Sequence, residues 1–297
     1  MSSIDLHMHS SYSSDGEYTP KELIELCKQA GLKTISLTDH NSVKGIKEAQ
    51  QFAKESNLRI IPGIEIDCTH EGNNLHILGY NIDYSDKRFF ELEESVINEE
   101  QKATKIRLEK IKQMGIQYDD QELKKMAFHG IITGEMIAES ALRIDSLKPS
   151  DKRNPLLAPF YNSKNPYVDF YWAYCSQGKP AYAPISFISL SEAVELIRTT
   201  GGTPVFAHPA KNIGCNKLLL DSIISEGIQG IEVYSNYHSE DETNFYLTYA
   251  ENNQLFYTCG SDFHGKTKPS IQLGVFGQTI NEIQIINQPG IQKIIRN

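Results

Sequence analysis

Short apolar segments alternate with capped, amphipathic segments over the first 80 residues, and this alternation limits the possible folds more than any other feature. Four apolar segments have the length and composition of strands, at residues 4–8, 34–37, 59–66 and 75–80. Thr19 and Glu22 form a capping box with Pro20 at the first helical position, and a second helix is expected over residues 43–55. Strand–helix alternation of this kind predicts a parallel sheet with helices packed on it.

The same alternation returns in the last third of the chain. Ser189 and Glu192 form a second capping box. Strands are predicted at residues 203–207, 230–234 and 255–259, between helices at 189–200, 216–226 and 241–252. The two stretches together contain six or seven β/α units, which indicates an α/β protein built on a (β/α) barrel.

The middle of the chain follows a different pattern. Helices are expected there over residues 87–114, 121–128 and 135–142. Prolines between Pro149 and Pro166 then predict an irregular loop. We therefore expect a barrel formed by residues 1–98 and 184–297, and a helical insertion formed by residues 99–183.

Charge and composition argue against several classes of partner. The formal net charge of −9 disfavours contact with nucleic-acid backbones and anionic membranes. No apolar stretch approaches the roughly 20 residues that cross a bilayer, and no leader-like segment precedes the first strand. The five cysteines are scattered without a C-x-x-C pair, which is typical of a reducing compartment. We expect a cytoplasmic protein that binds neither duplex DNA nor membranes.

Histidines and acids lie at or beside the ends of several predicted strands. His7 and His9 are two residues apart, so a strand points both to one face. Asp262 and His264 repeat this spacing after the last predicted strand. Four further groups lie in or after other strands: His40, Glu65, His76 and His208. Each has an ordinary alternative explanation, because a single His-x-His is often a half-buried pair and an aspartate after a strand often caps a helix.

The joint pattern favours one common site over these separate explanations. Ionisable groups recur at five or six strand ends, mostly the C-terminal ends, where barrel enzymes gather their catalytic groups. A mixture of imidazole and carboxylate ligands suits Zn²⁺, Mn²⁺ or Fe²⁺, and the lack of thiolates argues against a structural zinc site. The sequence therefore predicts a catalytic metal centre.

The segments around these residues resemble the PHP family, the polymerase and histidinol phosphatase superfamily of metal-dependent phosphoesterases. The similarity runs in order along nearly the whole chain, through six short motifs that contain His7 and His9, Asp15, His40, Glu65, His208, and Asp262 with His264. It is strongest to stand-alone bacterial members with a helical insertion. The resemblance implies a distorted (β/α)₇ barrel with a trinuclear metal site that the insertion covers.

The resemblance also implies how two or three divalent ions (Mn, Fe or Zn) are shared among nine ligands. One ion would be held by His7, His9, Glu65 and Asp262. A second would share Glu65 and be completed by His76 and His208. A third would be held by Asp15, His40 and His264. The residues expected to act in catalysis are Asp15, His40, Glu65 and His264, and the presence of all nine ligands favours an active enzyme.

In such members the reaction is hydrolysis of a phosphomonoester by attack of a hydroxide that bridges two metal ions. The resemblance implies action on the 3′-phosphate of 3′,5′-nucleoside bisphosphates or on short oligonucleotides, including short single-stranded RNA. One alternative is a phosphatase for histidinol phosphate or another small molecule. Another is a non-catalytic, metal-stabilised module, which would be expected to have lost ligands.

One departure from the family pattern concerns the substrate. Related members often read Ile-Thr-Arg in the insertion, where the arginine suits a phosphate, but here Gly134 follows Ile132 and Thr133. Lys179 and Lys211 are candidates to supply the missing charge, and His238 is a third candidate substrate contact. Each also has an ordinary interpretation as a solvated lysine or a loop histidine.

Overall fold

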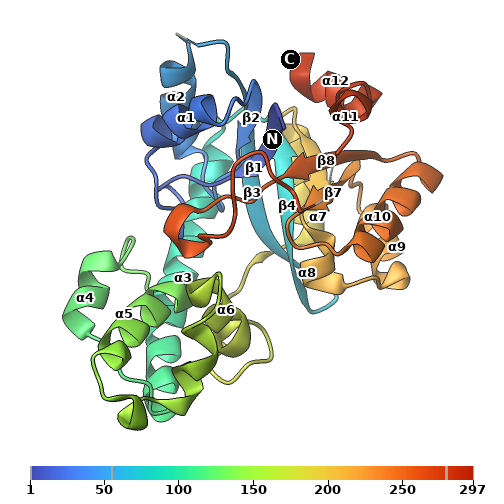
Figure 1. Ribbon diagram of the computed structural model, residues 1–297. Helices are drawn as coiled ribbons and strands as arrows, with labels where there is room; N and C mark the ends of the chain where they lie inside the picture. Colours follow the sequence, from blue (N-terminus) through green and yellow to red (C-terminus); the bar gives the residue numbers. More distant parts are fainter. Residues whose placement is uncertain (1, 55, 278–279, 297) are drawn as a thin grey trace. The chain divides into compact units, whose positions relative to one another are not determined.

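The computed structural model describes residues 2–54, 56–277 and 280–296 (Figure 1). Its contacts divide the chain into two compact units. The barrel unit comprises the residues up to Leu92, Phe187–His264 and the residues from Ile271 onward. The insertion unit comprises Glu93–Ser186 and Gly265–Ser270. Each unit is described separately below.

An eight-stranded sheet forms the centre of the barrel unit. Its path runs β1 (Ile4–Met8), β2 (Thr34–Leu37), β3 (Arg59–His70), β4 (Asn73–Tyr80), β6 (Thr203–Phe206), β7 (Gly230–Ser235) and β8 (Phe256–Gly260), while the short β5 (Ile188–Ser189) pairs with β3. The first and last strands meet, because the Asp262 amide donates to the carbonyl of His7 and the His9 amide donates to that of Phe263. The sheet is therefore nearly closed, and the predicted α/β barrel is confirmed.

The direction of β4 differs from the prediction of an all-parallel sheet. β4 runs antiparallel to both of its neighbours, β3 and β6. Only Glu71 and Gly72 separate β3 from β4, and both have left-handed backbones with φ of 48° and 78°. A two-residue turn of this kind joins antiparallel strands, whereas a parallel connection needs a crossover of a dozen residues or more. The two strands therefore form a hairpin inside an otherwise parallel sheet.

Helices pack around the strands of the barrel unit (Figure 1). They are α1 (Pro20–Gln29), α2 (Lys44–Ala53), α7 (Leu190–Thr199), α8 (Pro209–Ile213), α9 (Lys217–Ser225), α10 (Glu240–Asn252), α11 (Glu282–Ile286) and α12 (Pro289–Arg296). The capping boxes predicted at Thr19 and Ser189 are both formed. The predicted helix over 43–55 ends at Ala53, and residue 55 lies outside the described residues. The two C-terminal helices were not predicted.

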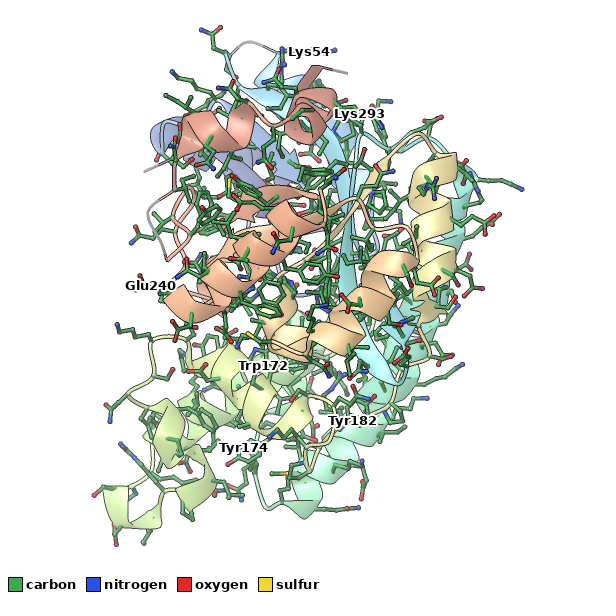
Figure 2. All side chains as sticks on the ribbon, turned by 90° about the vertical axis from the view of Figure 1, so that its right-hand side faces the viewer. Lys54, Trp172, Tyr174, Tyr182, Glu240 and Lys293 are labelled. Carbon is green, nitrogen blue, oxygen red and sulfur yellow. The ribbon has the colours of Figure 1, made fainter. Side chains whose placement is uncertain are left out.

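The insertion unit is mainly helical. It contains most of α3 (Lys87–Gln113), together with α4 (Asp120–Met126), α5 (Gly134–Ser146), α6 (Pro166–Phe170) and the short helical turns η1 (Ser150–Lys152), η2 (Pro155–Phe160) and η3 (Tyr171–Cys175). The prediction of an irregular loop after Pro149 was therefore wrong for much of that segment. The reason is packing: Tyr174, labelled in Figure 2, stacks edge-on against Phe160 and Phe170 in a separate apolar core.

Among the described residues, no helix combines the length and the apolar character needed to span a bilayer.

Candidate metal centre

Strand ends bring the predicted ligands together in the barrel unit. His7 and His9 lie at the end of β1, His208 follows β6, and Asp262 and His264 follow β8. Because parallel strands end at the same edge of a sheet, these side chains meet. His76 lies in the first half of β4, and the antiparallel direction of that strand brings its beginning beside the end of β3. The hairpin thus explains how a residue early in a strand reaches the same edge.

Four fully or nearly fully buried groups form the middle of the cluster. They are His7, His9, Glu65 and Asp262, whose ligand atoms all lie within 4.8 Å of one another. His7 Nε2 lies 3.1 Å from Glu65 Oε2, and His9 Nε2 lies 3.0 Å from Asp262 Oδ1.

The remaining predicted ligands surround these four groups. Glu65 Oε1 lies 3.0 Å from both His76 Nδ1 and His208 Nε2, and these three residues form a second compact group. His9, His40 and His264 form a third, and His264 Nε2 lies 3.1 Å from Asp15 Oδ2. The structure therefore gathers all nine predicted ligands in one cluster.

Outer hydrogen bonds orient three of the six imidazoles. His7 Nδ1 donates to the fully buried Glu232, 2.9 Å away. His9 Nδ1 donates to Ser13 Oγ over 3.1 Å, and His264 Nδ1 donates to the carbonyl of Asp262 over 2.9 Å. In each case the Nδ1 proton points outward, so Nε2 faces the other ligands. Such outer partners are the usual means by which proteins fix metal-binding histidines.

The inward-facing atoms fit divalent cations. His7 Nε2 and His9 Nε2 face each other at 3.1 Å, a distance at which two bare nitrogens repel unless a positive charge lies between them. His40 Nδ1 and Asp67 Oδ1 are buried, lie 3.3 Å apart and have no amide or hydroxyl partner among the described residues. Buried polar atoms are rarely left without partners, and this mixed nitrogen and oxygen set is one that transition-metal ions accept.

The pKa values of the imidazoles move in opposite directions, according to whether burial or the nearby acids have the larger effect. Burial lowers the pKa of His9 to about 4, so its imidazole is neutral near pH 7. Burial also opposes the charged form of His40, but Glu65 raises the pKa of His40 to about 10. Burial would raise the pKa of Glu65, yet the neighbouring imidazoles, above all that of His7, hold it well below its usual value. Cations binding between these groups would displace imidazole protons.

The chain is similar to proteins of one family over most of its length. The family model of the PHP domain matches residues 5–139. A 3′,5′-nucleoside bisphosphate phosphatase from Chromobacterium violaceum is 30% identical over 279 residues, which cover 89% of this chain and 88% of the relative. The chain belongs to the PHP family.

Two further proteins are similar to the chain, one in sequence and one in fold. A 5′-3′ exoribonuclease from Haemophilus influenzae is 28% identical over 264 residues, covering 88% of this chain and 89% of the relative. The solved structure of an amidohydrolase from Chromobacterium violaceum has the same fold, with a TM-score of 0.80 at 24% identity over 99% of this chain and 96% of that one. As a PHP protein with such relatives and an intact cluster of ligands, the chain is a metal-dependent phosphoesterase.

Two acids of this PHP centre escaped the sequence analysis, the buried Glu232 and the partly buried Asp67. Glu232 lies in β7 between apolar neighbours, and besides His7 it accepts the backbone N–H of His208 over 2.8 Å. Asp67 lies in β3, 3.3 Å from His40 Nδ1. A signal for Asp67 was available, since it lies two residues after Glu65 and a strand places both on one face. The strand had been predicted to end at residue 66.

The backbone around the PHP centre is locally strained. His208 and Asp262 have φ of 26° and 57°, in the left-handed region that side chains other than glycine rarely adopt. Gly260 is required by close approach, because a Cβ there would lie 2.2 Å from His7 Cβ and 2.4 Å from Glu232 Oε1. Strain of this kind persists where surrounding contacts hold it, and it is common at functional sites.

The three candidate substrate contacts have different surroundings. Lys211 is exposed, and its Nζ lies 5.1 Å from the ring centre of Tyr237, whose hydroxyl donates to Asp262. Lys179 is exposed in the insertion unit. His238 is buried, its Nδ1 donates to the carbonyl of Val233, and its Nε2 accepts the amide of Ala210. Both ring nitrogens of His238 thus contact backbone groups, and its role as a substrate contact stays a prediction.

Proposed function

We propose that this enzyme removes the 3′-phosphate from 3′,5′-nucleoside bisphosphates or acts on short oligonucleotides. The observation that carries the proposal is the cluster of nine imidazole and carboxylate groups, six of them buried and three partly buried. The substrate class is supported by the similarity, over 88% of its length, to a phosphatase of that specificity. The similarity to an exoribonuclease supports the inclusion of short RNA.

The cluster offers three sets of ligands for cations. We propose the sets implied by the family: His7, His9, Glu65 and Asp262; Glu65, His76 and His208; and Asp15, His40 and His264. Divalent ions bound there would supply Lewis acidity and a lowered pKa of bound water, the chemistry that phosphate-ester hydrolysis needs near pH 7. Glu65 belongs to two sets because its two oxygens face different imidazoles, His7 on one side and His76 on the other.

The chain's own groups then hold this arrangement and receive the substrate. Glu232 and Ser13 keep the Nε2 atoms of His7 and His9 turned inward. Of the two candidate lysines, Lys211 has the better support as a phosphate contact, because its neighbour Tyr237 also bonds to the predicted ligand Asp262. An ammonium group there would neutralise charge on the phosphate and add to binding. The part played by Lys179 stays a prediction.

The absence of an arginine at position 134 has a structural basis. A Cβ on Gly134 would lie 2.9 Å from Cys175 Sγ and 3.0 Å from a ring carbon of Tyr171. A larger residue would therefore force these side chains to move. The insertion unit is packed around glycine at this point, so a cation for the second phosphate has to come from elsewhere.

A phosphate-release screen with added Mn²⁺ tests the proposal. The substrates are adenosine 3′,5′-bisphosphate, histidinol phosphate and a short RNA, and we expect the bisphosphate to be hydrolysed fastest. The variant His9→Ala should lose both turnover and bound metal, whereas His129→Ala, an exposed histidine of the insertion unit, should retain both. Inactivity of the metal-loaded enzyme on all three compounds would refute the proposal, and a preference for histidinol phosphate would replace its substrate.

A further inference from the structure

Asp67 occupies a defined place between two of the predicted ligands. In the β3–β4 hairpin it lies directly opposite His76, and such cross-strand neighbours have adjacent side chains. Asp67 Oδ1 lies 3.2 Å from His76 Nε2 and 3.3 Å from His40 Nδ1. The ligand atoms of these three residues lie within 4.8 Å of one another. Asp67 therefore connects the His40 side of the cluster to its His76 side.

A neighbouring asparagine holds the Asp67 carboxylate in this orientation. Asn41 Nδ2 donates to Asp67 Oδ2 over 2.7 Å, and the Asp67 amide donates to Asn41 Oδ1 over 3.0 Å. This reciprocal pair occupies one carboxylate oxygen and leaves the other facing the two imidazoles. That second oxygen, Oδ1, is buried and has no amide or hydroxyl donor among the described residues, so its neighbours are the two imidazole nitrogens.

The two oxygens of the Asp67 carboxylate thus have different surroundings. Each oxygen of a buried carboxylate needs a partner, because an unsatisfied buried oxygen is costly. Here Oδ2 accepts from the Asn41 side-chain amide, and Oδ1 lies 3.2 Å from His76 Nε2 and 3.3 Å from His40 Nδ1. An oxygen held in this way beside two imidazoles has the surroundings of a metal ligand.

We propose that Asp67 is a tenth ligand of the metal centre, binding through Oδ1 a cation that His40 or His76 also holds. This inference rests on the metal centre proposed above, and it adds a ligand that the family resemblance does not include. An additional carboxylate supplies a hard oxygen and a further negative charge, which favours Mn²⁺ among the candidate ions.

Metal binding, measured apart from activity, tests the inference. The proteins compared are the wild type, Asp67→Asn, Asp67→Ser and the control Asp241→Asn, which alters an exposed aspartate on α10. Each is stripped of metal, titrated with Mn²⁺ by calorimetry and assayed for metal content. We expect both Asp67 variants to lose one ion per chain or to bind one ion at least about tenfold more weakly. The control should match the wild type.

Each outcome has a separate meaning. A folded Asp67 variant with wild-type stoichiometry and affinity would overturn the inference, whereas a wild type that binds no Mn²⁺ would overturn the metal centre itself. A crystal structure of the Mn²⁺-loaded wild type tests the same point without any substitution. Asp67 Oδ1 at about 2.0–2.2 Å from an ion would support the inference, and Asp67 without a bound ion would contradict it.

Discussion

Replacing Glu232 with glutamine tests how strongly the centre depends on an acid that is not a predicted ligand. Glu232 is fully buried, with Oε1 accepting from His7 Nδ1 over 2.9 Å and Oε2 accepting from the His208 amide over 2.8 Å. Glutamine has nearly the same size but only one oxygen. Its NH₂ group must therefore face one of these two N–H donors, and one hydrogen bond is lost whichever way the amide turns.

The expected effect follows from these two contacts. Loss of an outer partner of a metal-binding histidine typically weakens metal binding by about 10- to 100-fold, or about 1.4–2.8 kcal/mol. The unpaired buried N–H should in addition lower the stability of the metal-free protein by about 1–3 kcal/mol. His7 is the more sensitive neighbour, because the carboxylate fixes which of its nitrogens faces the centre.

Calorimetric titration with Mn²⁺ measures the first quantity, and thermal unfolding of the metal-free protein measures the second. The matched control is Glu195→Gln, which changes an exposed residue of α7. A Glu232→Gln protein with wild-type Mn²⁺ affinity would refute the idea that Glu232 orients His7 for metal binding. Reduced thermal stability with unchanged affinity would assign Glu232 a purely structural role.

Two further predictions concern stability. Chelation of the metal ions should lower the melting temperature by about 5–10 °C, since a ligand at 100 times its dissociation constant stabilises by about 2.7 kcal/mol; an unchanged melting curve after verified metal removal would contradict this. In the insertion unit, burial would raise the pKa of Asp145, but donors from Tyr161, Lys148 and Asn154 hold it below its ordinary value. This carboxylate therefore stabilises the fold above about pH 4 and ceases to do so as the pH falls through its folded pKa. Asp145→Asn should cost about 1–3 kcal/mol at pH 7 and nothing in strong acid, which urea unfolding at both pH values can measure.

Much of the barrel could be predicted from local signals. Strands at 4–8 and 34–37 and the capping boxes at Thr19 and Ser189 depend on near neighbours in the sequence, and the structure has them where they were expected. The direction of β4 could not be predicted in this way, because it depends on β3 extending to His70 and on the two-residue turn that follows. Polar residues from Asp67 to Asn74 resemble a loop in sequence, so the short turn between two long strands was hidden.

The grouping of the predicted ligands could likewise be inferred from the sequence because it follows a local pattern. Histidines at strand ends have a recognisable pattern, and the structure gathers all nine predicted ligands. Glu232 has no such pattern, because a single acid inside an apolar strand looks alike whether it pairs with His7 or with any other donor. The contacts of His238 have no sequence signal either, since its partners are backbone groups, which every residue type supplies.

The meeting of the first and last strands has a consequence for how the protein is made. Ribosomes deliver the N-terminal strand first, yet its neighbour in the closed sheet is β8. His7 and His9 therefore emerge long before Asp262 and His264, and the full set of ligands cannot exist on a partly synthesised chain. Until the last strand arrives, the carboxylates and imidazoles already made lack part of their enclosure. The set of predicted ligands is thus complete only after the last strand and His264 have been synthesised.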